Sequence, residues 1–540
     1  MSPLIKAFIH KTVAVLGASY GGARTAQLLA QQLPSDWRVV LIDRNTHFNH
    51  LYALPRFATL PGHEHKAFIP YTNVYELPPD IPSIGDRSRH LILNAQVTSI
   101  KEHSLTLSRS FPEHDIVNGV LNFDFAVYAL GSHLPAPINL WGPVGDEEDV
   151  KASEKPESAP VTSEETPASL RTETSGESTP VAVAPASFPA KAVVVSSTRV
   201  NSESFVTKPQ PVQLKPSSNI LTEKPATELV RGTKPAAINW LKRFHKRIEK
   251  ASSVLVVGGG ALGIQYASDI AEVFPNKAVT LLHSRQRLLP RFDEGMHDEI
   301  LSTLFSLNVT TILGERLDLN YPGKIVVNEH GIPERMVRTL SGREIRAELV
   351  LLCTGQTPNT GLIKELLPDS IVPEGSSKGS IRVTRTLQIG VPAPVASTST
   401  TGSNLSVSST STSPSEKQEA HAQDPELTVP YPNLFAIGDA ADAFGAINAG
   451  HNAYFQGEVA ARNILKIIEA ANEGKDEKEV ELEKYTPGPP AIKISLGLTK
   501  ALFQINGVVG KKSDVSEDLD APAMWNYMHI ATDEEGMLTL

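Results

Sequence analysis

Residues 11–43 read KTVAVLGASYGGARTAQLLAQQLPSDWRVVLID. A short apolar run at 13–16 is followed by a glycine-rich turn and a helical pattern, and a second apolar run ends at Asp43. This order is typical of a βαβ unit, whose helix N-terminus offers N–H groups to a pyrophosphate. A carboxylate about 20 residues after the glycines can accept a hydrogen bond from a ribose hydroxyl. The stretch therefore predicts a dinucleotide-binding unit, although a glycine turn alone would also serve simple packing.

A second stretch of the same kind covers residues 253–282. Its glycines, Gly258, Gly260 and Gly263, match the full G-x-G-x-x-G pattern. The strand that follows ends in HSRQR at 283–287, which contains two arginines and no acid. A carboxylate at this place favours NAD, whereas arginine accommodates the 2′-phosphate of NADP. The alternative is that these arginines only decorate the surface.

Other apolar runs extend this pattern. Residues 91–107 alternate as in a hairpin, with a turn predicted at His103-Ser104. Residues 123–131 and 348–355 are both predicted strands that end in glycine, so the chain contains two similar modules, one nested inside the other. Residues 238–250 predict an amphipathic helix with a basic face.

The stretch NLFAIGDAAD at 433–442 predicts a strand that ends in Gly438-Asp439, before a helix expected at 448–468. Such an ending can aim an aspartate at a polar ligand, but acid and glycine together are also a common turn. Arg56, in the loop after Asp43, can reach a phosphate or a flavin edge, or be a solvated surface charge.

Composition restricts the classes of function. The 540 residues carry a formal net charge of −10 with a pI near 5.9, which argues against nucleic acid as a partner. Cys353 is the only cysteine, so the chain has no CxxC redox pair and no cysteine-based zinc site, and we predict no metal. Cys353 lies in an apolar run and is expected to be buried and inert. Redox chemistry would therefore need a cofactor.

Two stretches rich in Ser, Thr and Pro, at 146–236 and 390–429, predict disordered inserts. The N-terminal MSPLIKAFIHKT has neither a signal-peptide pattern nor a glycine at position 2, and no run is long enough to span a membrane. We therefore expect a cytoplasmic protein, with at most peripheral association with mitochondrial or other organelle membranes.

Together these motifs resemble the two-dinucleotide flavoprotein oxidoreductases related to glutathione reductase. Within them the chain is most similar to the apoptosis-inducing-factor-like, mitochondrion-associated group that includes ferroptosis suppressor protein. The segments VTLLHS, LVLLCTG, NLFAIGDAAD and YTPGPPAIKISLG carry this likeness, which excludes both inserts.

The resemblance implies an α/β fold of two Rossmann-like domains, with the NAD(P) domain inserted in the FAD domain and a small C-terminal region. It implies FAD and, as electron donor, NADH or NADPH. The FAD-binding segments would be 1–145, 366–389 and 430–475, the NAD(P) domain 237–365, and the C-terminal region with its acidic tail 476–540. The implied cofactor-binding residues are Gly17, Ser19, Gly21, Gly22, Asp43, Arg44, Arg56, Val97, Gly131, Gly258, Gly260, Gly263, His283, Arg285, Gly355, Gly438 and Asp439.

The resemblance also implies that electrons pass from the nicotinamide to the flavin and then to a quinone or similar small acceptor. No obligatory catalytic side chain is predicted, although Gln265 stands where many relatives carry Glu and is a possible nicotinamide contact. Asn452 and Gln456 lie one helical turn apart and would contact the acceptor, or be polar residues of a packed helix. Alternatives are a redox-state-dependent signalling flavoprotein with little turnover and a reductase for a protein acceptor. The oligomeric state is left open.

Overall fold

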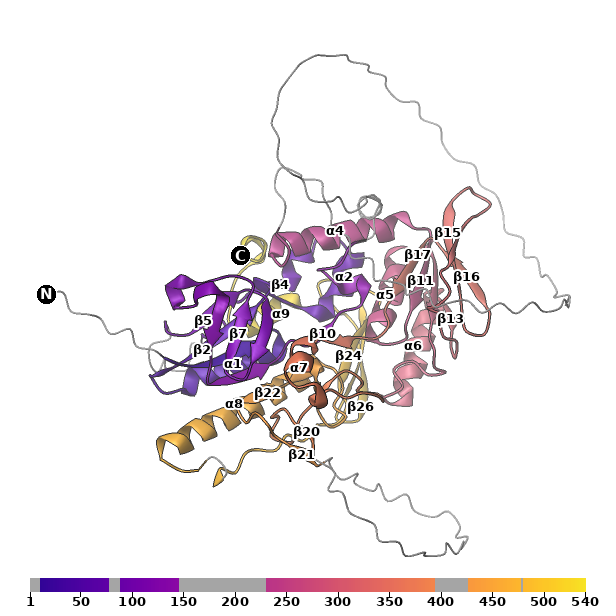
Figure 1. The fold of residues 1–540 in the computed structure, drawn as a ribbon. Coiled ribbons are helices and arrows are strands. Elements are labelled where there is room, and N and C mark those ends of the chain that lie inside the picture. Colours follow the sequence, from indigo (N-terminus) through magenta and orange to yellow (C-terminus); the bar gives the residue numbers. More distant parts are fainter. Residues whose placement is uncertain (1–9, 77–87, 145–229, 394–425, 477–478) are drawn as a thin grey trace, which may run out of the picture. The chain divides into compact units, whose positions relative to one another are not determined.

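The computed structural model of the chain describes residues 10–76, 88–144, 230–393, 426–476 and 479–540 (Figure 1). The predicted disordered inserts lie largely outside the described residues. The short strands β20 (Val391–Pro392) and β21 (Leu427–Thr428) pair with each other at the two ends of the second insert.

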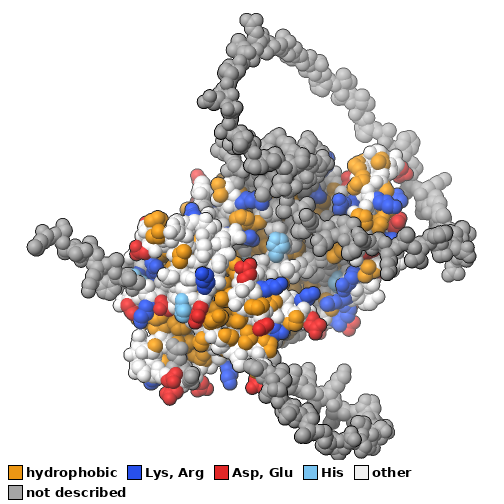
Figure 2. Space-filling view, viewed as in Figure 1, with side chains coloured by type: hydrophobic (Ala, Val, Ile, Leu, Met, Phe, Trp, Pro, Cys, Tyr) orange, Lys and Arg blue, Asp and Glu red, His pale blue; other side chains and the backbone are white. Residues whose placement is uncertain are grey.

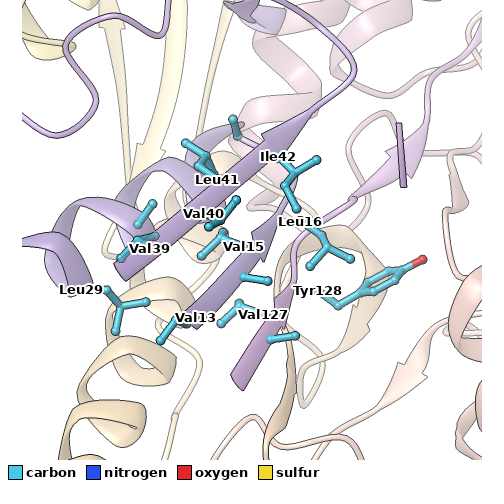
Figure 3. Close-up of a cluster of buried hydrophobic side chains, with 14 of the residues drawn as sticks. Val13, Val15, Leu16, Leu29, Val39, Val40, Leu41, Ile42, Val127 and Tyr128 are labelled. Carbon is cyan, nitrogen blue, oxygen red and sulfur yellow. The ribbon is translucent and has the colours of Figure 1, made fainter. Parts of the chain in front are cut away.

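The first sheet is parallel and has the strand order β22-β9-β1-β2-β5. Its strands are β22 (Leu434–Ala436), β9 (Phe125–Tyr128), β1 (Lys11–Leu16), β2 (Trp37–Asp43) and β5 (Leu91–Asn94). Helix α1 (Tyr20–Gln32) connects β1 to β2, as the opening stretch predicts. Side chains of β1, β2, β9 and α1 meet in the core between them (Figure 3).

The predicted hairpin at 91–107 is correct only in its second part. β6 (Val97–Lys101) and β7 (Ser104–Leu107) pair antiparallel, and β8 (Val120–Asn122) adds to them. The turn falls at Glu102 and His103. Residues 91–94 instead join the first sheet beside β2, because an uninterrupted apolar run suits a strand in a parallel sheet.

The second sheet is parallel as well, in the order β13-β12-β11-β17. Its strands are β13 (Thr310–Ile312), β12 (Ala278–Leu282), β11 (Ser253–Val257) and β17 (Leu349–Leu352). Helix α5 (Ala261–Val273) connects β11 to β12, and α6 (Glu294–Ser306) leads to β13. An antiparallel sheet of β14 (Lys324–Val327), β15 (Pro333–Arg338) and β16 (Glu344–Ala347) extends from this module (Figure 1).

Two long helices differ from their predicted bounds. α4 (Lys234–Lys250) begins before the expected start at residue 238, with proline in its first turn, where the missing N–H costs nothing. Its buried residues lie on one face, so the amphipathic pattern is confirmed. α8 (Gly450–Asn472) starts slightly after the expected residue 448 and packs on α1.

The two strands predicted to end in glycine, β9 and β17, lead into a shared ribbon. After Gly131 the chain forms β10 (Ser132–His133), and after Gly355 it forms β18 (Thr357–Pro358). These two short strands pair antiparallel and so connect the first module to the second.

The C-terminal region consists of the antiparallel sheet β24 (Ile492–Leu496), β25 (Lys500–Ile505) and β26 (Val508–Lys512), followed by α9 (Ala521–Tyr527) and α10 (Glu534–Thr539). The acidic tail is folded against the molecule: Trp525 is buried and donates to the Lys66 carbonyl, and the Lys66 ammonium pairs with Asp518 and Glu534. Among the helices that the structure describes, none has the length and apolarity needed to cross a membrane.

Candidate active site

The carboxyl ends of four parallel strands bring the predicted FAD residues to one edge of the first sheet. Gly17 follows β1 and donates its N–H to the Ile42 carbonyl at the end of β2. On the other side Ala129 donates to Leu16, and Ile437 donates to Tyr128. Gly17, Asp43, Gly131 and Asp439 therefore gather at the edge where open α/β sheets bind their ligands.

The first glycine turn is too tight for side chains. A Cβ on Gly17, which has a φ of +96°, would lie 2.4 Å from the Ala129 carbonyl oxygen, and one on Gly22 would lie 1.8 Å from the Gly17 carbonyl oxygen. Gly21 lets α1 approach α8, since its Cβ would lie 2.6 Å from the Ala453 carbonyl oxygen. Ser19 is the N-cap of α1 but makes no capping bond with its side chain. The first-turn N–H groups therefore remain suited to an anion.

Asp43 is held by the turn that it faces. Its Oδ2 accepts from the Ala18 N–H at 2.7 Å, and its Oδ1 accepts from the Asn45 N–H at 2.7 Å. Burial raises the pKa of Asp43, and these two bonds oppose that effect. A carboxylate has about four acceptor sites, so two backbone bonds leave capacity for a ribose hydroxyl.

The second glycine turn repeats the geometry of the first. A Cβ on Gly258 would lie 2.7 Å from the Cys353 carbonyl oxygen, and one on Gly263 would lie 1.8 Å from the Gly258 carbonyl oxygen. No atom lies within 4 Å of a Cβ built on Gly260, so the middle glycine faces open space. This space fits the close approach of a pyrophosphate.

His283 takes the place that Asp43 has in the first module. Its Nδ1 accepts from the Gly259 N–H at 3.0 Å, which leaves Nε2 to donate to the Arg287 carbonyl at 3.2 Å. Burial lowers the pKa of His283, so the imidazole is neutral near neutral pH. The Arg285 side chain is exposed beside it.

The segment after β22 is held by amide side chains. The Gly438 N–H donates to Gln456 Oε1 at 2.7 Å, and Asn452 Nδ2 donates to the Ile447 carbonyl at 2.9 Å. Both amides are buried and bonded to the backbone, as expected of polar residues on a packed helix. Their contact with an acceptor stays a prediction. Burial raises the pKa of Asp439 to about 6.

Both expectations for Arg56 are wrong. The side chain is fully buried, and its Nε and Nη2 bond the two carboxylate oxygens of Asp269 at 3.0 and 3.1 Å. The three remaining N–H groups donate to the carbonyls of Gly497, Leu498 and Glu517. A guanidinium has five N–H donors, so none is left for a cofactor or for water.

Gln265 and Cys353 lie inside the second module. Gln265 is buried on α5, and its Nε2 donates to Ser495 Oγ at 3.0 Å and to the Tyr52 carbonyl at 3.3 Å. Cys353 is buried as expected, and burial raises the pKa of its thiol. Gly355, just beyond it, has a positive φ like Gly131.

Two residues that contact predicted site residues, Trp141 and Asn359, were not predicted from the sequence. Arg44 stacks on Trp141, with its Cζ 4.5 Å from the ring centroid, and Trp141 Nε1 donates to Asn45 Oδ1. Asn359 donates from its backbone N–H to Gly131 and from its side chain to Leu130. Val97 of β6, a predicted cofactor contact, is buried in the hydrophobic core that includes the first sheet.

The residues present fit two dinucleotides. Each module ends a central strand in a glycine turn whose first and last glycines leave no room for a Cβ, and each turn opens a helix that no side chain caps. The residue at the end of the second strand is an acid in one module and a neutral imidazole in the other. The fold and the two sites together define a protein of two dinucleotide-binding modules.

The family model described as pyridine nucleotide-disulphide oxidoreductase matches residues 226–393. Fe-regulated protein 8 of Mycosarcoma maydis is 36% identical over 535 residues, which are 98% of each chain. The chain belongs to the pyridine nucleotide-disulphide oxidoreductase family, and it is an NAD(P)H-dependent flavoprotein oxidoreductase with FAD and NAD(P)H as cofactors.

More distant similarities are partial. Ferroptosis suppressor protein 1 of Homo sapiens is 26% identical over 305 residues, which cover 54% of this chain and 65% of that protein. The solved structure of a ferredoxin reductase from Rhodopseudomonas palustris aligns with a TM-score of 0.49 at 13% identity, covering 92% of this chain and 82% of that chain.

Proposed function

We propose that the protein passes electrons from NAD(P)H through FAD to a quinone or a similar small acceptor. The observation that carries this proposal is the pair of glycine turns of equal geometry, one at the carboxyl edge of each parallel sheet. The two turns give one seat for a resident cofactor and one for an exchangeable reductant. Bound FAD supplies the two-electron chemistry that links a hydride donor to the acceptor.

The chain's own residues divide between the two seats. We assign 1–145, 366–389 and 430–475 to the FAD-binding part and 237–365 to the NAD(P)-binding part. Asp43 would accept from the FAD ribose and Asp439 from the ribitol chain, while the first turns of α1 and α5 would each bind a pyrophosphate. Gln265 has both N–H groups bonded, so it would contact the nicotinamide carboxamide only as an acceptor through Oε1.

The single cysteine supports a small acceptor. A dithiol relay needs two cysteines beside the flavin, and this sequence has only Cys353, which is buried with a raised thiol pKa. The acceptor must therefore take electrons directly. Hydrophobic side chains gather over α8 on the face drawn in Figure 2, and Phe455 of that helix is 54% exposed, which suits an apolar acceptor such as a quinone.

Electrostatics at the second seat favour NADPH. The neutral His283 replaces the carboxylate that would repel a 2′-phosphate, and the exposed guanidinium of Arg285 lies two residues away. A charge-assisted bond between Arg285 and that phosphate would favour NADPH over NADH.

The test is stopped-flow reduction of the purified flavoprotein by NADH and by NADPH, followed by steady-state turnover with a panel of quinones and oxygen. We expect bleaching of the flavin absorbance by NADPH and turnover with a quinone above ~1 s⁻¹, the low end of ordinary enzymes. A protein that contains no flavin and cannot be reconstituted with FAD would contradict the proposal. Normal cofactor binding with negligible turnover on every acceptor would instead support the signalling alternative, which is motivated by Gln265 in place of Glu and by the two long inserts.

A further inference from the structure

One face of α5 is polar although the helix is buried. Gln265, Asp269 and Glu272 follow one another at helical spacing, so they lie on the same side. All three bond to segments outside the second sheet: Gln265 to Tyr52 and Ser495, Asp269 to Arg56, and Glu272 to the Leu498 N–H at 2.7 Å. We call these three residues and their partners, together with Gly497, the α5 junction.

Arg56 is the centre of the α5 junction. It lies on α2 (Leu54–Thr59), in the segment that follows Asp43 and β3 (His47–Asn49), and it reaches Asp269 on α5. Its other donors bond carbonyls of the turn between β24 and β25 and of the C-terminal segment, at 2.5 Å for Gly497, 3.3 Å for Leu498 and 3.2 Å for Glu517. One side chain therefore joins three parts of the chain that are far apart in sequence.

The α5 junction directly connects the segments that lead from the two proposed nucleotide sites. α5 begins at the second glycine turn, while the segment that carries Tyr52 and Arg56 continues from the strand that ends in Asp43. Tyr52 and Arg56 are four residues apart, as are Gln265 and Asp269, so two successive contacts fix the direction of α5 as well as its distance.

The buried contact between Arg56 and Asp269 is better suited to fixing the positions of its partners than to increasing the stability of the fold. Replacing a buried ion pair by apolar residues of similar volume is often neutral or stabilising, so the pair is weak evidence for stability. Five directional hydrogen bonds from one planar group, in contrast, permit a single arrangement of their partners.

We propose that the α5 junction sets the position of the NAD(P) seat relative to the FAD seat, and that Arg56 is a positioning residue for hydride transfer. This inference rests on the function proposed above. Hydride transfer requires the reacting atoms to be held within a narrow range of distance, and a displacement of about 1 Å can slow a reaction by about 10²-fold.

The experiment uses the full-length flavoprotein with the variants Arg56→Lys and Arg56→Met/Asp269→Leu. Lysine keeps the charge but has three donors, and the double variant removes the ion pair without leaving a buried charge. Arg24→Met is the matched control, because Arg24 of α1 also makes two bonds to an acid, Glu458 of α8, but within the first module. For each protein we would measure FAD content, NADPH affinity, denaturant unfolding, the charge-transfer absorbance of the flavin with bound nicotinamide, and the rate constant of flavin reduction at saturating NADPH.

We expect flavin reduction to fall by about 10²-fold in both Arg56 variants, with weaker charge-transfer absorbance and unchanged cofactor affinities. The control should reduce its flavin at the wild-type rate. Wild-type reduction in the double variant would overturn the positioning role. Lost NADPH affinity in Arg56→Lys would also overturn it, because the junction would then shape the nucleotide site itself rather than its distance from the FAD site. A wild-type protein that binds no FAD, or that no nicotinamide reduces, would refute the proposed function, and the inference would fall with it.

Discussion

Alanine at Gly263 tests which seat holds the reductant. The new Cβ would lie 1.8 Å from the Gly258 carbonyl oxygen, and Cβ atoms essentially never approach closer than 3.0 Å, so the turn must open by about 1.2 Å. Overpacking against backbone atoms that cannot rotate away costs about 1–3 kcal/mol. If that strain is relieved by displacing the turn from the nucleotide, affinity falls by about 5- to 150-fold.

The assay is a titration of the FAD-loaded Gly263→Ala protein with NADPH, beside a measurement of its FAD content. We expect weaker NADPH binding and a normal FAD content, because the first turn is untouched. Gly22→Ala should do the reverse, since its Cβ meets the Gly17 carbonyl oxygen at the same 1.8 Å. Loss of FAD from Gly263→Ala with normal NADPH binding would mean that the two seats are assigned the wrong way round.

Gly260→Ala is the matched control. A Cβ at this position meets no protein atom within 4 Å, so the substitution strains nothing in the free protein. Any loss of NADPH affinity in this variant must therefore come from contact between the new methyl group and the bound nucleotide. If Gly260→Ala and Gly263→Ala both bind NADPH as the wild type does, the turn is not the nucleotide seat.

Three further results are expected. Burial lowers the pKa of His47 to about 4, while the unfolded side chain titrates near 6.5. The unfolded state therefore binds more protons between these two pH values, and the free energy of unfolding falls as the pH drops through this range. His47→Phe should recover about 3 kcal/mol of this loss in denaturant unfolding, and an unchanged loss would contradict the burial argument. Arg285→Ala should weaken NADPH binding by about 1.5–3 kcal/mol and leave NADH binding unchanged, and equal effects on both would remove the 2′-phosphate contact. Trp525→Ala should lower the free energy of unfolding by about 3–5 kcal/mol, because the ring is 1% exposed, and a smaller loss would show that the C-terminal segment adds little to the fold.

The sequence predicted the parts of the site that are made by neighbouring residues. Each glycine turn, its strand and its helix lie within one short stretch, so spacing alone predicts both turns and places each at the carboxyl edge of its own sheet. The wrong strand pairing predicted for residues 91–94 shows the limit of such local information. An apolar run predicts a strand, but its partner is decided by a sheet whose other strands lie elsewhere in the chain.

Contacts between distant segments could not be predicted. Arg56 and Asp269 are 213 positions apart, and nothing around Arg56 distinguishes a buried charge from a cofactor ligand. The one available signal was Asp269 itself, an acid in the helix stretch YASDIAEV, because a buried carboxylate needs a charged or hydrogen-bonding partner. For Asn452 and Gln456 the helical spacing gave the shared face correctly, but only the packing of α8 shows that this face looks inward.

Asp43 and His283 explain how two similar turns can serve different nucleotides. The Ala18 N–H in one module and the Gly259 N–H in the other occupy equivalent positions, and each is bound by the residue that ends the second strand. Exchanging the acid for imidazole therefore keeps the bond that shapes the turn, because Nδ1 of the neutral imidazole accepts from the Gly259 N–H and burial lowers the pKa of His283. Only the negative charge is lost, and that charge is what would repel a 2′-phosphate. The absence of an acid at position 283 therefore leaves the turn intact, which is the physical basis for proposing NADPH as the reductant.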